Sequence, residues 1–296
     1  MRGSKPERAI EQAVASDGVV SRGDKLLIAC SGGPDSVALA ALLARIAQPM
    51  SLDLVLGHVN HGARPSAWQD EAVTLRVSAA LGIPLKIVAL ETPARLDEAS
   101  LREARYAALT QLAQACGASA VVTAHNAEDQ TETVLLALFR GTGLEGLGGM
   151  PARRPMGTGL ELVRPLLRWD RQVLRAYVQQ AGLPYALDPT NADMEYRRNA
   201  VRQMLVALRP IFPGLDAAVA RTATVVAAEV QGSGQAARRQ QVRAALREQE
   251  ALRDVDFAHV EAAARALSAG GSGRFHMKSG VEVAIEKGTL TVRRDT

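Results

Sequence analysis

The chain has 296 residues, of which 47% are hydrophobic, so it is long enough for one large α/β domain and a smaller second one. Only two cysteines occur, which excludes a disulfide framework and a Cys-x-x-Cys metal site. The formal net charge of +4 is compatible with a polyanionic partner, although many ordinary enzymes carry a similar excess. No apolar run is as long as a membrane span and no signal segment is recognisable, so we expect a cytoplasmic protein without a membrane partner.

Strands and helices alternate through the first two thirds of the chain. Continuous apolar runs typical of buried parallel strands lie at 26–29, 52–58, 85–90, 120–123 and 160–163. Helices are expected after them at about 37–46, 66–81, 97–116, 127–139 and 170–181. Repeating βα units with short connections predict an α/β fold with a doubly wound parallel sheet. Its ligand crevice should lie at the carboxyl ends of the strands.

The character of the sequence changes beyond Pro213. An alanine-rich helical tract at 216–230 is followed by a Gly-Ser break at 232–234 and a second helical region that runs to 253. Apolar residues then alternate between 281 and 292 around Lys287-Gly288, which predicts a β-hairpin. We therefore expect a larger domain at 1–215 and a small C-terminal α+β domain at 216–296.

The most informative segment is Ser-Gly-Gly-Pro-Asp-Ser at 31–36, between the first strand and its helix. The two glycines allow several backbone N–H groups to point into one concavity at a helix N-terminus, while Ser31 and Ser36 add hydroxyl donors. Asp35 would repel a bare phosphate, so its presence indicates a bridging Mg²⁺ ion. A turn that merely needs small residues is the alternative, but the placement of the polar groups favours a loop that holds pyrophosphate.

Further polar segments follow the later strands. They are Val-Asn-His-Gly-Ala-Arg at 59–64, Ser-Leu-Arg-Glu-Ala-Arg-Tyr at 100–106, Thr-Ala-His-Asn-Ala-Glu-Asp-Gln-Thr-Glu-Thr at 123–133, Arg-Pro-Leu-Leu at 164–167, Asp-Pro-Thr-Asn at 188–191 and Arg-Arg-Asn-Ala-Val-Arg at 197–202. Taken singly, each has an ordinary explanation as structural histidines, solvated charged helix faces or helix caps. His125 and Asp129 lie four residues apart and share a face if that segment is helical. The glycine-rich residues 141–149 suggest a mobile loop that closes on substrate.

In this order the motifs resemble those of the tRNA(Ile)-lysidine synthetases, which belong to the PP-loop N-type ATP pyrophosphatases. The resemblance covers about residues 25–205 and implies an adenine nucleotide alpha hydrolase-like fold. It also implies ATP-dependent attachment of free L-lysine to C2 of the wobble cytidine of tRNA(Ile) with a CAU anticodon. An adenylated cytidine is the expected intermediate, pyrophosphate and AMP are released, and lysidine is the product.

The chemistry of this reaction suits the residues. Ser31, Gly32, Gly33, Pro34 and Ser36 are expected to bind ATP through its pyrophosphate, and Asp35 is expected to hold Mg²⁺. The resemblance implies catalytic roles for His125, Asp129 and Arg198 as well as Asp35. Asp129 would hold the lysine ammonium and take its proton, while His125 would assist or orient the phosphates of ATP. Candidates for contact with substrate or tRNA are Arg64, Arg105, Asp129, Arg198 and Arg202.

Two residues depart from the family pattern, since Asn126 stands where a second histidine is common and Glu128 where an aspartate is. The first departure casts doubt on any role that needs two imidazoles. The chain resembles the shorter architecture of the family, and a homodimer is left open because no interface pattern is visible. Three rival functions remain: a tRNA thiolase, which would need a reactive Cys30 or Cys116, a small-molecule amidoligase, and an inactive nucleotide sensor.

Overall fold

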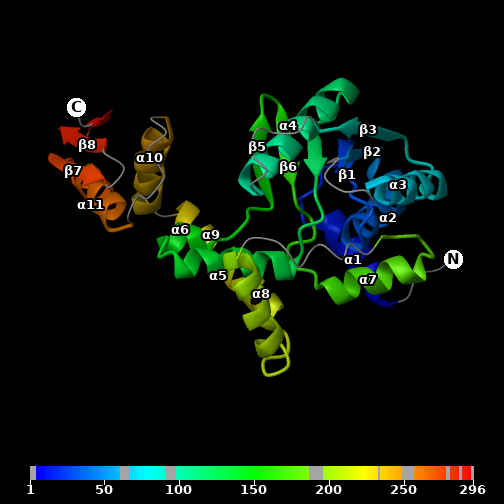
Figure 1. Ribbon diagram of the computed structural model, residues 1–296. Coiled ribbons are helices and arrows are strands. Elements are labelled where there is room, and N and C mark those ends of the chain that lie inside the picture. Colours follow the sequence, from blue (N-terminus) through cyan, green and yellow to red (C-terminus); the bar gives the residue numbers. More distant parts are fainter. Residues whose placement is uncertain are drawn as a thin grey trace. The chain divides into compact units, whose positions relative to one another are not determined.

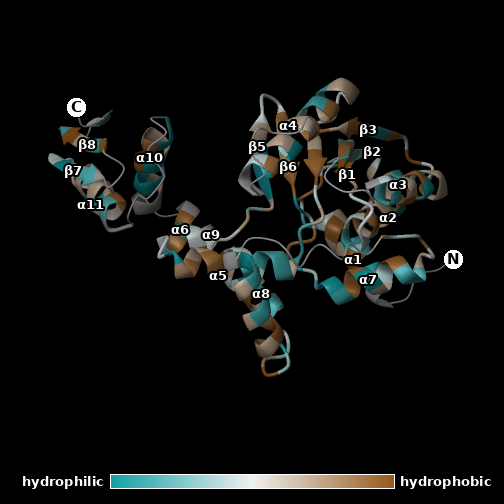
Figure 2. Cartoon of the chain, viewed as in Figure 1, coloured by the Kyte–Doolittle hydropathy of each residue, from teal (hydrophilic) through white to brown (hydrophobic). Residues whose placement is uncertain are grey.

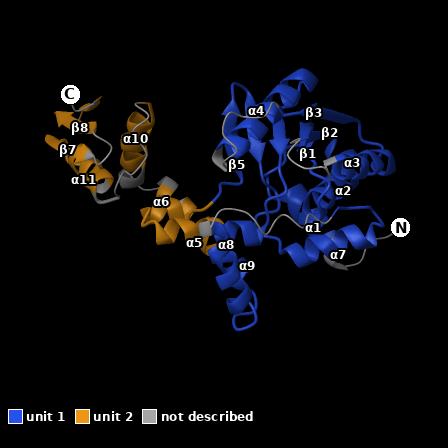
Figure 3. Ribbon diagram, in the orientation of Figure 1, with its two compact units in different colours: residues 1–132, 150–220 blue, residues 133–149, 221–296 orange. Residues whose placement is uncertain are grey.

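A computed structural model describes residues 5–60, 67–90, 98–186, 196–232, 234–248, 257–277, 281–286 and 289–294 (Figure 1). The chain divides into two compact units, one of residues 1–132 with 150–220 and one of residues 133–149 with 221–296 (Figure 3). Arg64, the motif at 188–191 and the expected turn at 287–288 lie outside the described residues. The functional division between residues 215 and 216 stays a prediction.

The first unit is built on a six-stranded sheet with the order β3-β2-β1-β4-β6-β5. Its strands are β1 Lys25–Ala29, β2 Asp53–Asn60, β3 Leu85–Ala89, β4 Ala120–Val122, β5 Arg153–Gly157 and β6 Leu160–Val163. All neighbours pair in parallel except β5, which runs antiparallel to β6. The predicted α/β fold with a doubly wound, mostly parallel sheet is confirmed. Strand β5 was not predicted, because Arg-Arg-Pro-Met-Gly has no apolar run and lies at an edge, where a proline is tolerated.

Helices cover both faces of this sheet. The helices that share its cores are α1 Lys5–Ser16, α2 Pro34–Met50, α3 Ala67–Leu81 and α7 Arg171–Gln180 on one side and α4 Glu98–Cys116 on the other. The first unit also contains α8 Tyr196–Leu208 and the first residues of α5 Ala127–Phe139 and α9 Leu215–Gly232, both of which continue into the second unit. Leu26 and Ile28 of β1 join a core with α1, α2, α3 and α7. Leu27, between them, packs with α4 in a second core. Because successive residues of a strand point to opposite faces, this continuous apolar strand is buried from both sides. Figure 2 colours strands at the centre of this sheet brown, as hydrophobic.

The strand order reverses between β1 and β4, which both lie at the centre of the sheet. In an open α/β sheet, a crevice forms at the carboxyl ends of the strands that flank such a reversal. The segments that leave β1 and β4 there are the 31–36 loop and the residues from Thr123 to Asp129. The topology therefore brings together the two motifs that carry most of the expected chemistry.

The second unit contains α6 Gly143–Leu147, α10 Gly234–Glu248, α11 Phe257–Ser268, β7 Gly273–Met277, β8 Val281–Glu286 and β9 Thr289–Arg294. Strands β8 and β9 pair antiparallel, as the alternating apolar residues predicted, but β7 adds a third strand on the other side of β8. Val281, Val283 and Ile285 pack with α10 and α11 in a separate core. In the part of the chain that is described, no helix has the length and apolar character needed to cross a membrane.

Candidate active site

The 31–36 loop is held by its own serines. Ser36 Oγ donates to the carbonyl of Gly33 at 2.8 Å and accepts from the Ser31 N–H at 3.2 Å. Helix α2 begins at Pro34. Proline suits the first helical position, because an N–H there would have no partner within the helix and because the proline ring holds φ near the helical value. These bonds hold the chain in the tight turn that a phosphate-binding loop requires.

Gly32 is required by the backbone of this turn. Its φ is +85°, in the left-handed region, and the amide of Ala186 donates to its carbonyl at 2.9 Å. A Cβ atom at residue 32 would lie 3.0 Å from the carbonyl oxygen of Asp70, a backbone atom that cannot easily retreat. Gly33 differs, since its φ is −73° and a Cβ would meet only the Ser31 hydroxyl at 3.5 Å.

Replacing Gly32 by alanine should therefore lower the free energy of unfolding by about 2 kcal/mol, from left-handed strain and the clash with Asp70. Replacing Gly33 by alanine should change that free energy by no more than about 0.5 kcal/mol. Urea unfolding of both variants measures the difference. Equal losses in the two variants would mean that the turn relaxes to accept a side chain.

Asp35 has one engaged and one unengaged carboxylate oxygen. Its Oδ2 accepts from Asn126 Nδ2 at 2.9 Å and from Arg171 Nε at 3.2 Å. Its Oδ1 is buried and has no hydrogen-bond partner among the described residues. Burial raises the pKa of Asp35, an effect that Arg171 opposes. A buried carboxylate oxygen without a donor is suited to a hard cation such as Mg²⁺, which prefers oxygen ligands.

Asn126 also determines how α5 begins. Its side-chain oxygen accepts from the Asp129 N–H at 3.1 Å, and Asp129 Oδ2 accepts from the Asn126 N–H at 3.1 Å. This reciprocal pair satisfies two donors at the helix start. Asn126 therefore both caps α5 and orients Asp35. The asparagine that stands here in place of the family's common second histidine therefore has a structural role of its own.

Arg171, at the start of α7, joins Asp35 to Asp129. Its Nε contacts Asp35, and its Nη2 lies 3.4 Å from Asp129 Oδ1. Its backbone N–H donates to both carboxylate oxygens of Glu128 at 3.0 Å, which satisfies a donor at the N-terminus of α7. Burial alone would lower the pKa of Arg171, but Asp129 and Asp35 raise it above its usual value. One guanidinium thus faces the two carboxylates expected to act in catalysis.

Arg198 and Arg202 both contact Glu132 on α5. The Glu132 side chain is only 3% exposed, and its two oxygens lie 3.2 Å from Arg198 Nε and 2.8 Å from Arg202 Nε. The spacing of four residues places both guanidiniums on one face of α8. They bind this carboxylate in the described structure, and their expected contact with nucleotide or tRNA stays a prediction.

His125 follows β4 and lies in a positive electrostatic environment. Its Nδ1 is 2.9 Å from Thr123 Oγ1, which leaves Nε2 for a ligand. Burial, followed by the charges of Arg164, Arg102 and Arg105, lowers its pKa to about 3. The imidazole is therefore neutral at physiological pH. It can orient a phosphate or a base through one hydrogen bond, but it cannot supply a proton as an imidazolium.

This depressed pKa predicts a loss of stability in acid. In the unfolded chain the His125 imidazole has a pKa near 6.5, whereas in the folded protein its pKa is about 3. Between these values the unfolded chain binds a proton that the folded protein does not. His125 therefore leaves stability unaffected above pH 7 and should lower it by about 1 kcal/mol as the pH falls to 5.5. Denaturant unfolding at both pH values should show a smaller loss in His125→Asn. An identical loss in that variant would contradict the assignment.

Residues 4–208 match the family described as a PP-loop domain. The chain belongs to the PP-loop family. It is similar to the tRNA(Ile)-lysidine synthase of Salinispora tropica, with 44% identity over 209 residues, 69% of this chain and 62% of that protein. It is also similar to the tRNA(Ile)-lysidine synthase of Symbiobacterium thermophilum, with 40% identity over 211 residues, 69% of this chain and 43% of that protein. The chain thus spans less than two thirds of the length of either relative.

Among solved structures, this PP-loop protein is similar to a U34-tRNA thiolase from Methanococcus maripaludis that carries a [4Fe-4S] cluster. The TM-score is 0.64 and the identity 18%, over 76% of this chain and 79% of the thiolase. At this identity the likeness shows a shared fold only. In this chain Cys30 is buried, and burial raises the pKa of its thiol, which disfavours a thiolate.

Four site residues were not predicted from the sequence: Arg171, Glu132, Arg164 and Tyr106. Glu132, Tyr106 and Arg164 lie within motifs that were noticed, but the sequence assigned none of the three a role in the site. Arg171 lies 136 residues from Asp35 along the chain, so no local pattern connects the two. The one available signal was a charged residue in the first turn of the helix expected at 170–181.

Proposed function

We propose that this PP-loop protein ligates lysine to C2 of the wobble cytidine of tRNA(Ile) with a CAU anticodon. Two similar relatives carry the name tRNA(Ile)-lysidine synthase, and members of the PP-loop family use ATP. The observation that carries the proposal is that Asp129 and Asp35 of the 31–36 loop contact the same guanidinium, that of Arg171. Those groups serve the two steps of the reaction, adenylation and amine transfer.

The first step makes the oxygen on C2 a better leaving group. That oxygen forms a bond to the α-phosphorus of ATP while the bond from this phosphorus to the pyrophosphate oxygen breaks. We assign the 31–36 loop to bind the departing pyrophosphate through backbone N–H groups and the hydroxyls of Ser31 and Ser36. Ser36 would have to exchange its bond to the Gly33 carbonyl for one to the phosphate. The step is accelerated because these donors are already oriented when the charge develops.

Asp35 is the residue best suited to hold Mg²⁺ in this site. Its unengaged Oδ1 supplies one oxygen ligand, and Mg²⁺ sites are commonly completed by substrate phosphates and water instead of an all-protein cage. This fits the described residues, among which no three His, Cys, Asp or Glu side chains gather as a metal site. When bound, the ion would supply neutralisation of charge on the phosphates.

The second step needs an uncharged amine, although a lysine ammonium has a reference pKa of about 10.4. We assign Asp129 to hold the ammonium and accept its proton. The nitrogen then bonds to C2, the bond from C2 to the activated oxygen breaks, and AMP leaves with that oxygen. Arg171 already contacts Asp129 through Oδ1, so the lysine ammonium would have to share this carboxylate with Arg171 or displace it.

The same proposal includes the remaining expectations. Free lysine is the second substrate, and residues 216–296 form the small domain that binds tRNA. Arg64, Arg105, Arg198 and Arg202 are the candidates for contact with substrate. A cytoplasmic location follows from the need for tRNA and ATP, and the oligomeric state, including a homodimer, can be measured by light scattering.

Incubation with an isoleucine tRNA transcript, ATP, Mg²⁺ and labelled lysine tests the function, with nucleoside mass spectrometry as the measurement. The expected product is lysidine, formed only when all four components are present. A product that depends on sulfide would instead identify a thiolase. Pyrophosphate release without RNA would identify a small-molecule ligase, and no turnover under any condition would identify a nucleotide sensor.

A further inference from the structure

Three arginines surround Tyr106 on the first unit. The guanidinium carbons of Arg102 and Arg154 each lie 5.4 Å from the centroid of the tyrosine ring. The charge of Arg164 also acts on Tyr106, since it helps to lower the pKa of the phenol. These residues come from α4, from β5 and from the segment after β6, so the tertiary fold alone gathers them. We call Arg102, Tyr106, Arg154 and Arg164 the Tyr106 cluster.

The positive charge of the Tyr106 cluster is not paired with a carboxylate in the part of the chain that the structure describes. Among the described residues, no ion pair involves Arg102, Arg154 or Arg164. Arg164 is 3% exposed, donates from Nη1 to the carbonyl of Pro151 at 2.8 Å, and has a buried Nε without a partner. A buried cation is normally paired, and Arg164 is buried beside two further arginines, Arg102 and Arg154, that are partly exposed. The concentration of positive charge around this buried guanidinium favours an anion as its partner.

The electrostatic effects on neighbouring groups agree with this view. Burial alone would raise the pKa of Tyr106, but Arg102, Arg164 and Arg105 lower it below its usual value. Arg164 and Arg102 also contribute to the low pKa of His125. The positive field therefore extends from Tyr106 to His125, at the edge of the sheet where β4 and β6 end. This is the edge that carries the proposed reaction.

We propose that the Tyr106 cluster binds a backbone phosphate of the RNA substrate beside the reacting nucleotide. The inference rests on the proposed function. Guanidiniums match phosphate oxygens in pairs, and most protein contacts to a nucleic-acid backbone are of this kind. A single carboxylate of free lysine is satisfied by one guanidinium, whereas a chain of phosphodiesters suits several. The phosphates of ATP are already assigned to the 31–36 loop.

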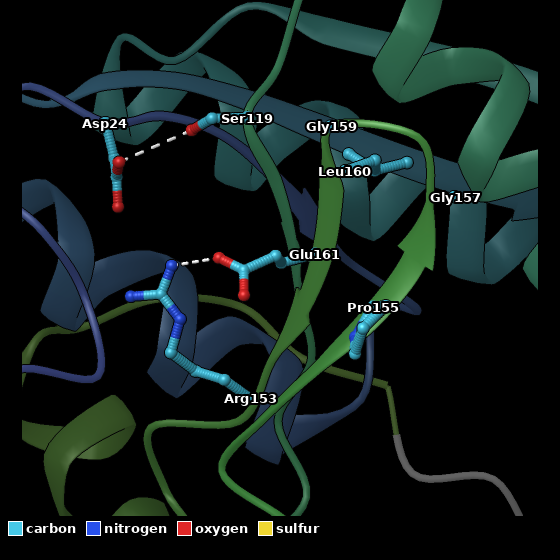
Figure 4. A pocket seen from close by; sticks show the side chains of 8 residues that line it. All are labelled: Asp24, Ser119, Arg153, Pro155, Gly157, Gly159, Leu160 and Glu161. Atoms are coloured by element: carbon cyan, nitrogen blue, oxygen red, sulfur yellow. Dashed lines mark hydrogen bonds and ion pairs between the residues drawn. The ribbon is translucent and has the colours of Figure 1, made fainter.

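Arg153 provides a matched control on the same strand. It precedes Arg154, so its side chain projects from the opposite face of β5. There it pairs with Glu161 and donates to Ser21 Oγ at 3.3 Å. Figure 4 shows Arg153 and Glu161 together in a pocket that Asp24 and Ser119 also line. The two neighbours have the same charge, but only Arg154 belongs to the Tyr106 cluster.

The test compares Arg154→Ala with Arg153→Ala in the full chain. The dissociation constant of the isoleucine tRNA transcript is measured without ATP or lysine, over a series of salt concentrations. Arg154→Ala should weaken binding about tenfold at low salt and reduce the slope of log affinity against log salt by about one. Arg153→Ala should stay within about twofold of the parent protein. Arg154→Lys should retain the slope, since the charge remains, while losing part of the affinity.

Equal tRNA affinities in Arg154→Ala and Arg153→Ala would overturn the inference. The inference would also be overturned if Arg154→Ala kept its affinity for tRNA but had a raised KM for ATP or for lysine, since the bound anion would then be a small substrate. Thermal unfolding of each variant identifies any change that comes from lost folding. If the parent protein binds tRNA but forms no lysidine, the proposed function fails while the phosphate site stands.

Discussion

Replacing Asp35 by asparagine is expected to reduce pyrophosphate release from ATP by about a thousandfold or more. The asparagine oxygen can still accept from Asn126 Nδ2 or Arg171 Nε, so the local hydrogen bonds are largely retained. The substitution removes the negative charge of Oδ1, the oxygen that has no partner among the described residues and that we assign to Mg²⁺. The rate loss should therefore come from metal and phosphate handling, with little change in folding.

The measurement is pyrophosphate release with saturating tRNA, over a range of Mg²⁺ concentrations. Asp35→Asn should need far more Mg²⁺ for any residual activity, because a neutral amide is a poor ligand for this ion. Asp53→Asn is a suitable control, since Asp53 begins β2 and forms a surface pair with Lys25 at 3.0 Å. Unchanged Mg²⁺ dependence in Asp35→Asn would remove Asp35 from the metal site.

Replacing Asp129 by asparagine is expected to separate the two steps. Adenylation should fall by no more than about threefold, whereas lysine transfer should fall by about a hundredfold or more. The amide keeps an oxygen that can accept from the Asn126 N–H, so the start of α5 remains capped. The missing charge can no longer hold an ammonium or take its proton. Adenylated tRNA should then accumulate in single-turnover experiments and be visible as an RNA-linked AMP label.

The pH dependence of this variant gives a second measurement. Without a base, lysine must arrive already deprotonated, and below its reference pKa of about 10.4 the free amine increases tenfold per pH unit. The transfer rate in Asp129→Asn should therefore rise about tenfold between pH 7 and pH 8, and the parent protein should rise less. An unimpaired transfer rate at pH 7 would show that another group takes the proton.

The positions of the expected site residues followed from the sequence to different degrees. Ser31, Asp35 and Ser36 were predicted to lie on one turn, because a strand, two glycines and a helix form a local pattern that few structures satisfy. The pairing of Arg198 and Arg202 with Glu132 was not predicted, since their spacing on α8 indicates a shared helix face but not which carboxylate that face meets. The role of Asn126 was likewise hidden, since only the folded chain places its amide against Asp35.

The sequence by itself determined the five parallel strands of the larger sheet, the turn at 31–36 and the family. Each of these depends on residues that are neighbours along the chain: apolar runs, glycine turns and motifs in a recognisable order. Only the tertiary structure decided that Arg171 bridges Asp35 and Asp129, and that Arg154, instead of Arg153, lies over Tyr106. Those contacts join separate strands and helices, whose meeting is set by the packing of side chains on both faces of the sheet.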